Sequence, residues 1–120
     1  MKPKVYFLST CDTCRRIMKE VGVDESFEQQ DIKVKPLTAE QAEHFYKYTG
    51  SYEALINKRA RKLKEELKQH PVKEDADYKD LLLMDYTFLK RPVFEIDNQL
   101  FVGNAPKTVE AIKEALAKKL

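Results

Sequence analysis

The hydrophobic pattern at the start of the chain changes from strand-like to helix-like and back. Residues 3–8 are too apolar for an exposed segment and predict a buried strand. From Thr13, apolar residues recur at helical spacing up to Gly22, which predicts a helix that ends at this glycine. Residues 27–32 predict a second strand. A strand, a helix and a strand within about 30 residues predict a right-handed βαβ unit with parallel strands.

The middle of the chain is predicted to be helical. A capping box at Thr38 and Gln41 predicts a helix that ends at the next glycine. Another helical stretch is expected to begin at Ser51. Residues 59–69 predict a solvated, highly charged helix with a narrow apolar edge, and residues 78–89 predict one helix that is buried on more than one side.

The C-terminal part returns to strands. Residues 92–96 and 100–102 are strand-like, and Asp97 and Asn98 between them predict the tight turn of an antiparallel hairpin. Pro106 is well placed to open a final helix.

This order of elements predicts an α/β fold. We expect a thioredoxin-like mixed four-stranded sheet with a helical insertion between its βαβ and ββα halves. We also expect residues 1–120 to form a single domain, with the insertion over roughly residues 38–89.

Composition narrows the environment more than the function. The chain has 22 basic and 20 acidic residues, a formal net charge of +2, and 42% hydrophobic residues. We therefore expect a soluble globular monomer without a direct nucleic-acid or membrane partner. The two cysteines and the lack of a recognisable leader sequence predict the reducing cytoplasm.

The chemistry is concentrated at the first strand–helix junction, where Cys11 and Cys14 are two residues apart. A helix N-terminus offers unpaired N–H groups and a positive dipole end, which favour an anion. A thiolate is such an anion, so we expect Cys11 to have a lowered pKa and to act as a nucleophile. A Cys-x-x-Cys pair in this position is typical of thioredoxin-like redox motifs.

The cysteine pair allows two other interpretations. A closed zinc site needs four ligands, but the two histidines, His44 and His70, are far from the cysteines in sequence, so we expect no metal. A structural disulfide would close too small a loop to add much stability. Redox chemistry is the favoured interpretation.

Four segments together resemble one family more than any other. They are residues 6–15, 54–59, 89–93 and 100–103. The Cys-x-x-Cys motif alone does not exclude thioredoxins and glutaredoxins. An Arg-Pro pair some 80 residues later, after an arginine-bearing helical insertion, is more specific to this one family. With these segments the chain resembles the arsenate reductase-like (ArsC/Spx) family of thioredoxin-fold proteins over essentially its whole length.

The resemblance implies roles for individual residues. Cys11 matches the family's catalytic cysteine, and Arg15 matches the arginine that follows it by four positions. Arg91 matches the arginine before the family's proline, here Pro92, which lies against the active-site loop and is commonly cis. Arg59 stands near the family's middle arginine, although it is offset. Such arginines would bind an oxyanion or a carboxylate in the substrate.

Two departures from the family's arsenate reductases change the expected chemistry. Those enzymes have a further arginine on the last hairpin, where residues 101–104 of this chain have none. They also have serine or another residue where this chain has Cys14. The resemblance therefore implies weak or absent arsenate reduction and a dithiol mechanism, in which Cys14 resolves the disulfide that Cys11 forms.

Two functions of different classes remain open. The first is a thiol–disulfide oxidoreductase that acts on a small thiol or a protein disulfide, binds no cofactor, and uses glutathione, thioredoxin or glutaredoxin as its reductant. The second is a Spx-like redox-sensing transcriptional regulator that binds RNA polymerase, favoured by the dithiol and by Val102 and Gly103. Of these two functions, we expect that of the oxidoreductase.

Overall fold

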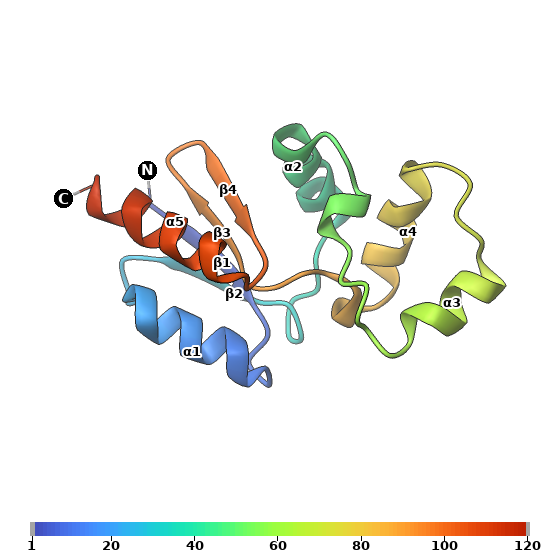
Figure 1. Cartoon of the computed structure of the whole chain (residues 1–120), viewed down its shortest axis with the longest axis horizontal. Coiled ribbons are helices and arrows are strands. Elements are labelled where there is room, and N and C mark those ends of the chain that lie inside the picture. The colour runs from blue at the N-terminus through green and yellow to red at the C-terminus, as the bar shows by residue number, and fades with distance from the viewer. Residues whose placement is uncertain (1, 120) are drawn as a thin grey trace. The chain divides into compact units, whose positions relative to one another are not determined.

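The computed structural model describes residues 2–119 (Figure 1). The chain forms two compact units: the first combines its N-terminal and C-terminal parts, and the second comprises Pro36–Lys90. Among the described residues, no helix has the length and apolar character needed to cross a lipid bilayer.

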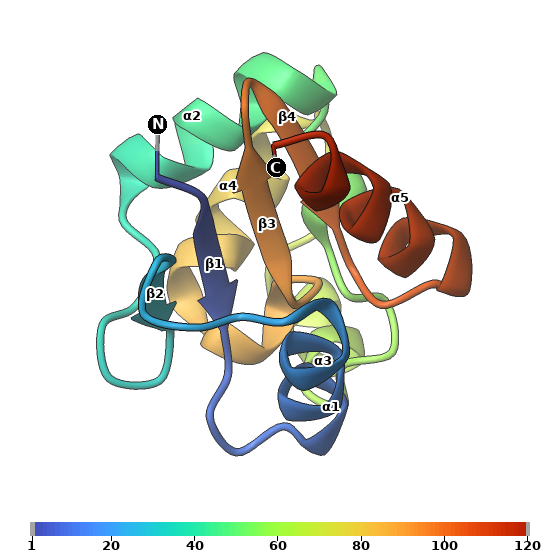
Figure 2. The ribbon, with the colours of Figure 1, turned by 90° about the vertical axis from the view of Figure 1, so that its left-hand side faces the viewer.

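The first unit contains a four-stranded mixed sheet with the order β2-β1-β3-β4 (Figure 2). Strand β1 (Lys4–Phe7) pairs in parallel with β2 (Glu28–Asp31) and antiparallel with β3 (Val93–Ile96). Strand β4 (Gln99–Val102) pairs antiparallel with β3. This topology confirms the predicted thioredoxin-like fold class.

Two helices cover the hydrophobic core of this unit, α1 (Asp12–Val21) and α5 (Pro106–Ala117). Helix α1 ends at Gly22, as predicted, because a φ of 84° lies in the left-handed region that glycine adopts without strain. Helix α5 begins with its proline, whose missing N–H would have no partner in the first turn. The buried residues of the core are Val5, Ile17, Phe27, Phe94, Ile96, Val109 and Ile112.

The second unit is helical. The predicted capping box is present, because Thr38 and Gln41 exchange two hydrogen bonds of 3.1 Å between side chain and backbone N–H. The elements are α2 (Ala39–Thr49), the 3₁₀ helix η1 (Glu53–Leu55), α3 (Leu63–Gln69), α4 (Ala76–Met84) and the 3₁₀ helix η2 (Tyr86–Phe88).

One helix predicted over residues 78–89 is wrong, because the chain breaks at Asp85 into α4 and η2. Asp85 is extended, with φ −150° and ψ 128°. Its carboxylate accepts hydrogen bonds from the backbone N–H and the hydroxyl of Thr87, at 2.8 and 2.7 Å. This local capping competes with helix continuation, which the apolar pattern alone did not reveal.

Two other helical segments are shorter than predicted. The stretch expected from Ser51 is only the short η1, whose start is held by the carboxylate of Asp75, which accepts the N–H of Tyr52 at 2.8 Å. The helix expected over residues 59–69 begins only at Leu63. In both places polar side chains satisfy backbone groups and support turns instead of helix.

Candidate active site

Cys11 is the N-cap residue of α1, at the end of the loop that follows β1. Its backbone N–H donates to the carbonyl of Leu8 at 3.0 Å, and Arg15 N–H donates to the carbonyl of Cys11 at 3.2 Å in the first helical turn. The Cys11 side chain is partly exposed, whereas Cys14, one turn further along, is fully buried. The first thiol is therefore partly accessible to solvent, whereas the second is enclosed in the protein.

The surroundings of Cys11 favour its thiolate. Partial burial opposes ionisation, but hydrogen bonds from the backbone and thiol of Cys14, the charge of Arg91 and the backbone of Thr13 outweigh it. The pKa of Cys11 is consequently below its ordinary value. This direction agrees with the lowered pKa predicted from the helix N-terminus.

Cys14 has the opposite environment. Burial raises the pKa of Cys14 to about 12, and the negative charge and hydrogen bond of Cys11 also raise it. A backbone hydrogen bond from Leu8 and the charge of Arg91 offset only part of this rise. Cys14 therefore keeps its proton near neutral pH and can donate it in a hydrogen bond to the Cys11 thiolate.

Arg91 and Pro92 lie beside the dithiol. Their peptide bond is cis, which confirms the expectation drawn from the resemblance. The next residue, Val93, pairs with Tyr6 of β1, so the Arg-Pro pair lies at the end of β1 from which the cysteine loop departs. The Nε atom of Arg91 is buried, and its charge lowers the pKa of both thiols.

Arg15 lies on the first turns of α1 with an exposed side chain. Its guanidinium pairs with the carboxylate of Asp12 and donates from Nη1 to the carbonyl of Ser9 at 3.3 Å. A substrate anion that binds Arg15 must therefore compete with Asp12. Because this pair is exposed to water, its contribution is small and the competition is weak.

Arg59 belongs to the second unit, in the turn between η1 and α3. Its side chain is exposed, and its backbone N–H donates to Oδ1 of Asn57 at 3.1 Å. The backbone N–H of Asn57 in turn donates to the carbonyl of Phe88 at 2.7 Å. The backbone of Arg59 is thus held by a well-bonded turn, and its role in substrate binding stays a prediction.

Asp31 lies near the cysteine loop and was not predicted from the sequence. It is the last residue of β2, and its Oδ1 accepts a hydrogen bond of 3.2 Å from the backbone N–H of Ser9. Its position at the end of a strand parallel to β1 was the available signal, because parallel strands end at the same edge of a sheet.

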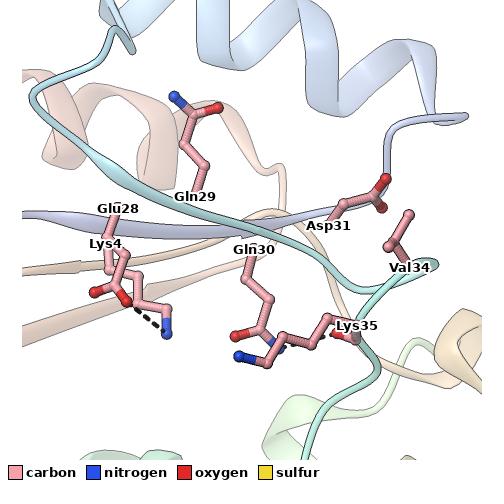
Figure 3. Close-up of a pocket in the computed structure, with 7 residues that line it drawn as sticks. All are labelled: Lys4, Glu28, Gln29, Gln30, Asp31, Val34 and Lys35. Atoms are coloured by element: carbon pink, nitrogen blue, oxygen red, sulfur yellow. Dashed lines mark hydrogen bonds and ion pairs between the residues drawn. The ribbon is translucent and has the colours of Figure 1, made fainter.

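A polar pocket of about 310 Å³ lies beside β2. Figure 3 shows the residues that line it. On one face of β2, Glu28 pairs with Lys4 of β1 at 3.6 Å. On the same face, the side-chain amide of Gln30 donates to the carbonyl of Lys35 at 3.0 Å. The side chain of Asp31 points to the other face (Figure 3), as the alternation of a strand requires. Asp31 is thus one of the residues that line this pocket, and its carboxylate bonds to the cysteine loop.

The groups around Cys11 suit an anion. Backbone N–H groups of the first helical turn and the guanidinium of Arg91 all stabilise negative charge on its sulfur. Within residues 2–119, no group of three or more His, Cys, Asp or Glu side chains is arranged to hold a metal ion. The arrangement can hold a thiolate beside a second, protonated thiol, which is what thiol–disulfide exchange needs.

Limiting iodoacetamide near neutral pH should alkylate Cys11 before Cys14. With a pKa of about 12, Cys14 is ionised in only roughly one molecule in 10⁵ at pH 7, whereas the pKa of Cys11 is lowered. Peptide mass spectrometry of a time course will identify the labelled residue. The Cys11 rate should fall as the pH falls through its lowered pKa, and preferential labelling of Cys14 would contradict the assignment.

Comparison with known proteins agrees with this geometry. The model of the ArsC family matches residues 6–112. An arsenate reductase (ArsC) related protein from Brucella melitensis, known from its solution structure, is 31% identical; the match covers 92% of this chain and 93% of that protein, with a TM-score of 0.64. No curated protein is significantly similar to the chain.

Two further solved structures share the fold at lower identity. An arsenate reductase from Vibrio cholerae is 16% identical, with a TM-score of 0.75 over 93% of this chain and 98% of that protein. An ArsC family related protein from Bacteroides fragilis is 20% identical, with a TM-score of 0.73 over 93% and 98% of the two chains.

Proposed function

The chain belongs to the ArsC family of thiol oxidoreductases, and we propose that it reduces disulfides with Cys11 as nucleophile and Cys14 as resolving thiol. The observation that carries the proposal is the opposite environment of the two thiols. Cys11 is partly exposed and has a lowered pKa, whereas Cys14 is buried and has a pKa of about 12. One thiol is prepared to attack, and the other stays protonated until it is needed.

The reaction proceeds in two exchanges. The Cys11 thiolate attacks one sulfur of the substrate disulfide, the substrate S–S bond breaks, and the departing thiolate takes a proton from solvent. Cys14 then loses its proton and attacks the sulfur of Cys11, which releases the second substrate thiolate and forms the Cys11–Cys14 disulfide. The dithiol supplies both electrons, and glutathione, thioredoxin or glutaredoxin restores it.

The first exchange activates Cys14. Once Cys11 is part of a mixed disulfide, it no longer bears a negative charge and no longer accepts the hydrogen bond of Cys14. Two of the causes that raise the pKa of Cys14 then disappear, while burial remains. The charge of Arg91 and the hydrogen bond from Leu8 still lower it. The resolving thiol thus becomes easier to ionise at the step that uses it.

The substrate we propose contains an anionic group near its disulfide, such as a carboxylate of glutathione in a mixed disulfide. Arg91 and Arg15 lie on the same unit as Cys11 and supply guanidinium groups that bind carboxylates in two-point contacts. Pro92 is the structural residue beside them. Arg59 is included as a third binding residue on the strength of the family resemblance.

A direct assay compares arsenate with a glutathionylated peptide, using glutathione and glutaredoxin as reductants. Turnover of the peptide should be higher, by about tenfold to a hundredfold, because each charge-assisted bond to an oxyanion is worth about 1.5–3 kcal/mol and residues 101–104 supply no arginine. The matched variant Asn104→Arg should raise arsenate turnover and leave peptide turnover unchanged. Faster turnover of arsenate than of the peptide by the natural sequence would contradict the proposal.

A Spx-like regulator is the second candidate, because the same lowered pKa makes Cys11 a suitable oxidation sensor. In that function, formation of the Cys11–Cys14 disulfide would change the affinity for RNA polymerase without turnover of a substrate. Either function needs a compartment in which the dithiol is reduced, and we propose the cytoplasm.

A further inference from the structure

We propose that Asp31 is a positioning residue for the nucleophile: by holding the backbone of Ser9, its carboxylate fixes the loop that aims Cys11 at the helix N–H groups. This inference deepens the proposed function and rests on Cys11 being the reactive thiol. Asp31 itself touches neither the cysteines nor a substrate in this assignment, and it acts through the loop.

Strand pairing brings Asp31 to the loop. Asp31 and Phe7 are the last residues of β2 and β1, and they are partners in the parallel register. The backbone N–H of Ile32 continues the ladder with a 2.8 Å hydrogen bond to the carbonyl of Phe7. The two strands therefore end side by side, and in Figure 3 the Asp31 carboxylate points toward the chain that leaves β1.

The carboxylate makes defined hydrogen bonds at this point. Its Oδ1 atom accepts from the backbone N–H of Ser9 at 3.2 Å and from the backbone N–H of Lys33 at 3.1 Å. Partial burial opposes ionisation of Asp31, but the hydrogen bond of the Ser9 side chain, the bonds from the backbone N–H groups of Lys33 and Ser9, and the charge of Lys33 outweigh it and lower the pKa of Asp31. The carboxylate is thus ionised at neutral pH and accepts both N–H groups.

The loop is held on both sides of Ser9. The N–H of Ser9 donates to the carboxylate of Asp31, and the carbonyl of Ser9 accepts a hydrogen bond from Nη1 of Arg15 at 3.3 Å. Two residues later, the N–H of Cys11 bonds to the carbonyl of Leu8 at 3.0 Å. These bonds leave little freedom in the backbone between β1 and α1, so they determine where the Cys11 sulfur lies relative to the N–H groups that stabilise its thiolate.

Positioning and direct charge have opposite consequences for Cys11. A carboxylate disfavours a neighbouring thiolate, so removing its charge alone would lower the pKa of Cys11. Removing the hydrogen-bond acceptor instead frees the loop, misaligns the sulfur with the N–H groups and raises the pKa of Cys11. The sign of the change therefore separates the two roles.

The experiment measures the pH dependence of Cys11 alkylation in Asp31→Ala, Asp31→Asn and the natural sequence. Asp31→Ala should raise the pKa of Cys11 by about one unit. At pH values below this pKa, alkylation should be slower by about threefold to tenfold, since the higher intrinsic reactivity of a more basic thiolate offsets part of the loss of thiolate. Asp31→Asn retains an oxygen acceptor without the charge, so its Cys11 pKa should equal or fall below the natural value.

Asp24→Ala is the matched control. Asp24 also accepts from a nearby backbone N–H, that of Ser26 at 2.9 Å, and its pKa is lowered chiefly by the hydroxyl and N–H of Ser26. Losing it should affect a local turn and leave the Cys11 profile unchanged. Amide hydrogen exchange should show faster exchange at Ser9 in Asp31→Ala only, which a general loss of stability would not produce.

The outcomes are decisive in each case. An unchanged or lowered Cys11 pKa in Asp31→Ala overturns the positioning role, as does an equal rise in Asp24→Ala. If Asp31→Ala does not fold, Asp31→Glu replaces it in the experiment. Its extra methylene displaces the carboxylate from Ser9, so the pKa of Cys11 should rise in this variant too. A natural protein whose Cys11 pKa is not lowered would instead contradict the proposed function, so the two failures are distinguishable.

Discussion

Replacing Cys14 with serine is expected to stop turnover and to leave the substrate covalently attached to Cys11. The first exchange needs only the Cys11 thiolate, which the N–H groups of α1 and Arg91 still stabilise. The second exchange needs an internal thiol, which the variant lacks. Because the internal thiol reacts at a high effective concentration, we expect kcat to fall by at least about a hundredfold.

Mass spectrometry of the intact Cys14→Ser protein after incubation with a glutathionylated peptide should show one added group, which is either glutathione or the peptide. The attached group should be released by an external reductant, which identifies it as a disulfide. Cys11→Ser is the paired control and should show neither turnover nor an adduct. Turnover at the natural rate by Cys14→Ser would contradict the dithiol mechanism.

The same variant separates the enzyme from the regulator. Purified from cells with thiols blocked, Cys14→Ser should retain small thiols or disulfide substrates in covalent linkage to Cys11 if the protein is a reductase. RNA polymerase recovered without covalent attachment, together with no adduct, would favour the regulator instead.

Replacing Arg91 with alanine is expected to raise the pKa of Cys11 and to lower kcat/KM for an anionic disulfide. The charge of Arg91 is one of the causes that lower the pKa of Cys11, so its loss leaves less thiolate at neutral pH. A lost charge-assisted contact is worth about 1.5–3 kcal/mol, which corresponds to about a tenfold to a hundredfold lower kcat/KM. The alkylation profile should move to higher pH.

Arg16→Ala is the matched control for this experiment. Arg16 lies on the same helix as Cys11, but its exposed guanidinium pairs with Glu20 at 3.7 Å. Its loss should change neither the Cys11 pKa nor kcat/KM by more than about twofold, because exposed pairs contribute little. Arg91→Lys should restore much of the pKa shift but less of the substrate affinity. Equal effects of Arg91→Ala and Arg16→Ala would contradict a specific role for Arg91.

Much of the sheet was predictable from the sequence because β1, β3 and the hairpin turn have strong local signals, whereas the polar β2 was expected mainly from the apolar residues Phe27 and Ile32 that flank it. Apolar runs predicted β1 and β3, and the pair Asp97 and Asn98 predicted the hairpin turn, where both residues have positive φ values of 45° and 64°. Gly22 predicted the end of α1 correctly. Each of these signals depends on neighbours in sequence.

The helical insertion was predicted less well because its elements end where polar side chains interact across turns. Asp85 ends α4 by binding Thr87, and Asp75 supports η1 from more than 20 residues away in sequence. A hydrophobic pattern records which faces are buried, but it does not record which aspartate will satisfy which backbone N–H.

Cys11 could be predicted as the nucleophile from the sequence alone, because it lies at a strand–helix junction and the N–H groups of its own helix stabilise its thiolate. The groups that surround this thiol depend on the tertiary structure. The antiparallel pairing of β1 with β3 places Arg91 beside it, and the parallel pairing of β1 with β2 places Asp31 at the preceding loop. These neighbours are 80 and 20 residues from Cys11 along the chain, so strand register brings them to the site, whereas the helix N-terminus is local to the motif.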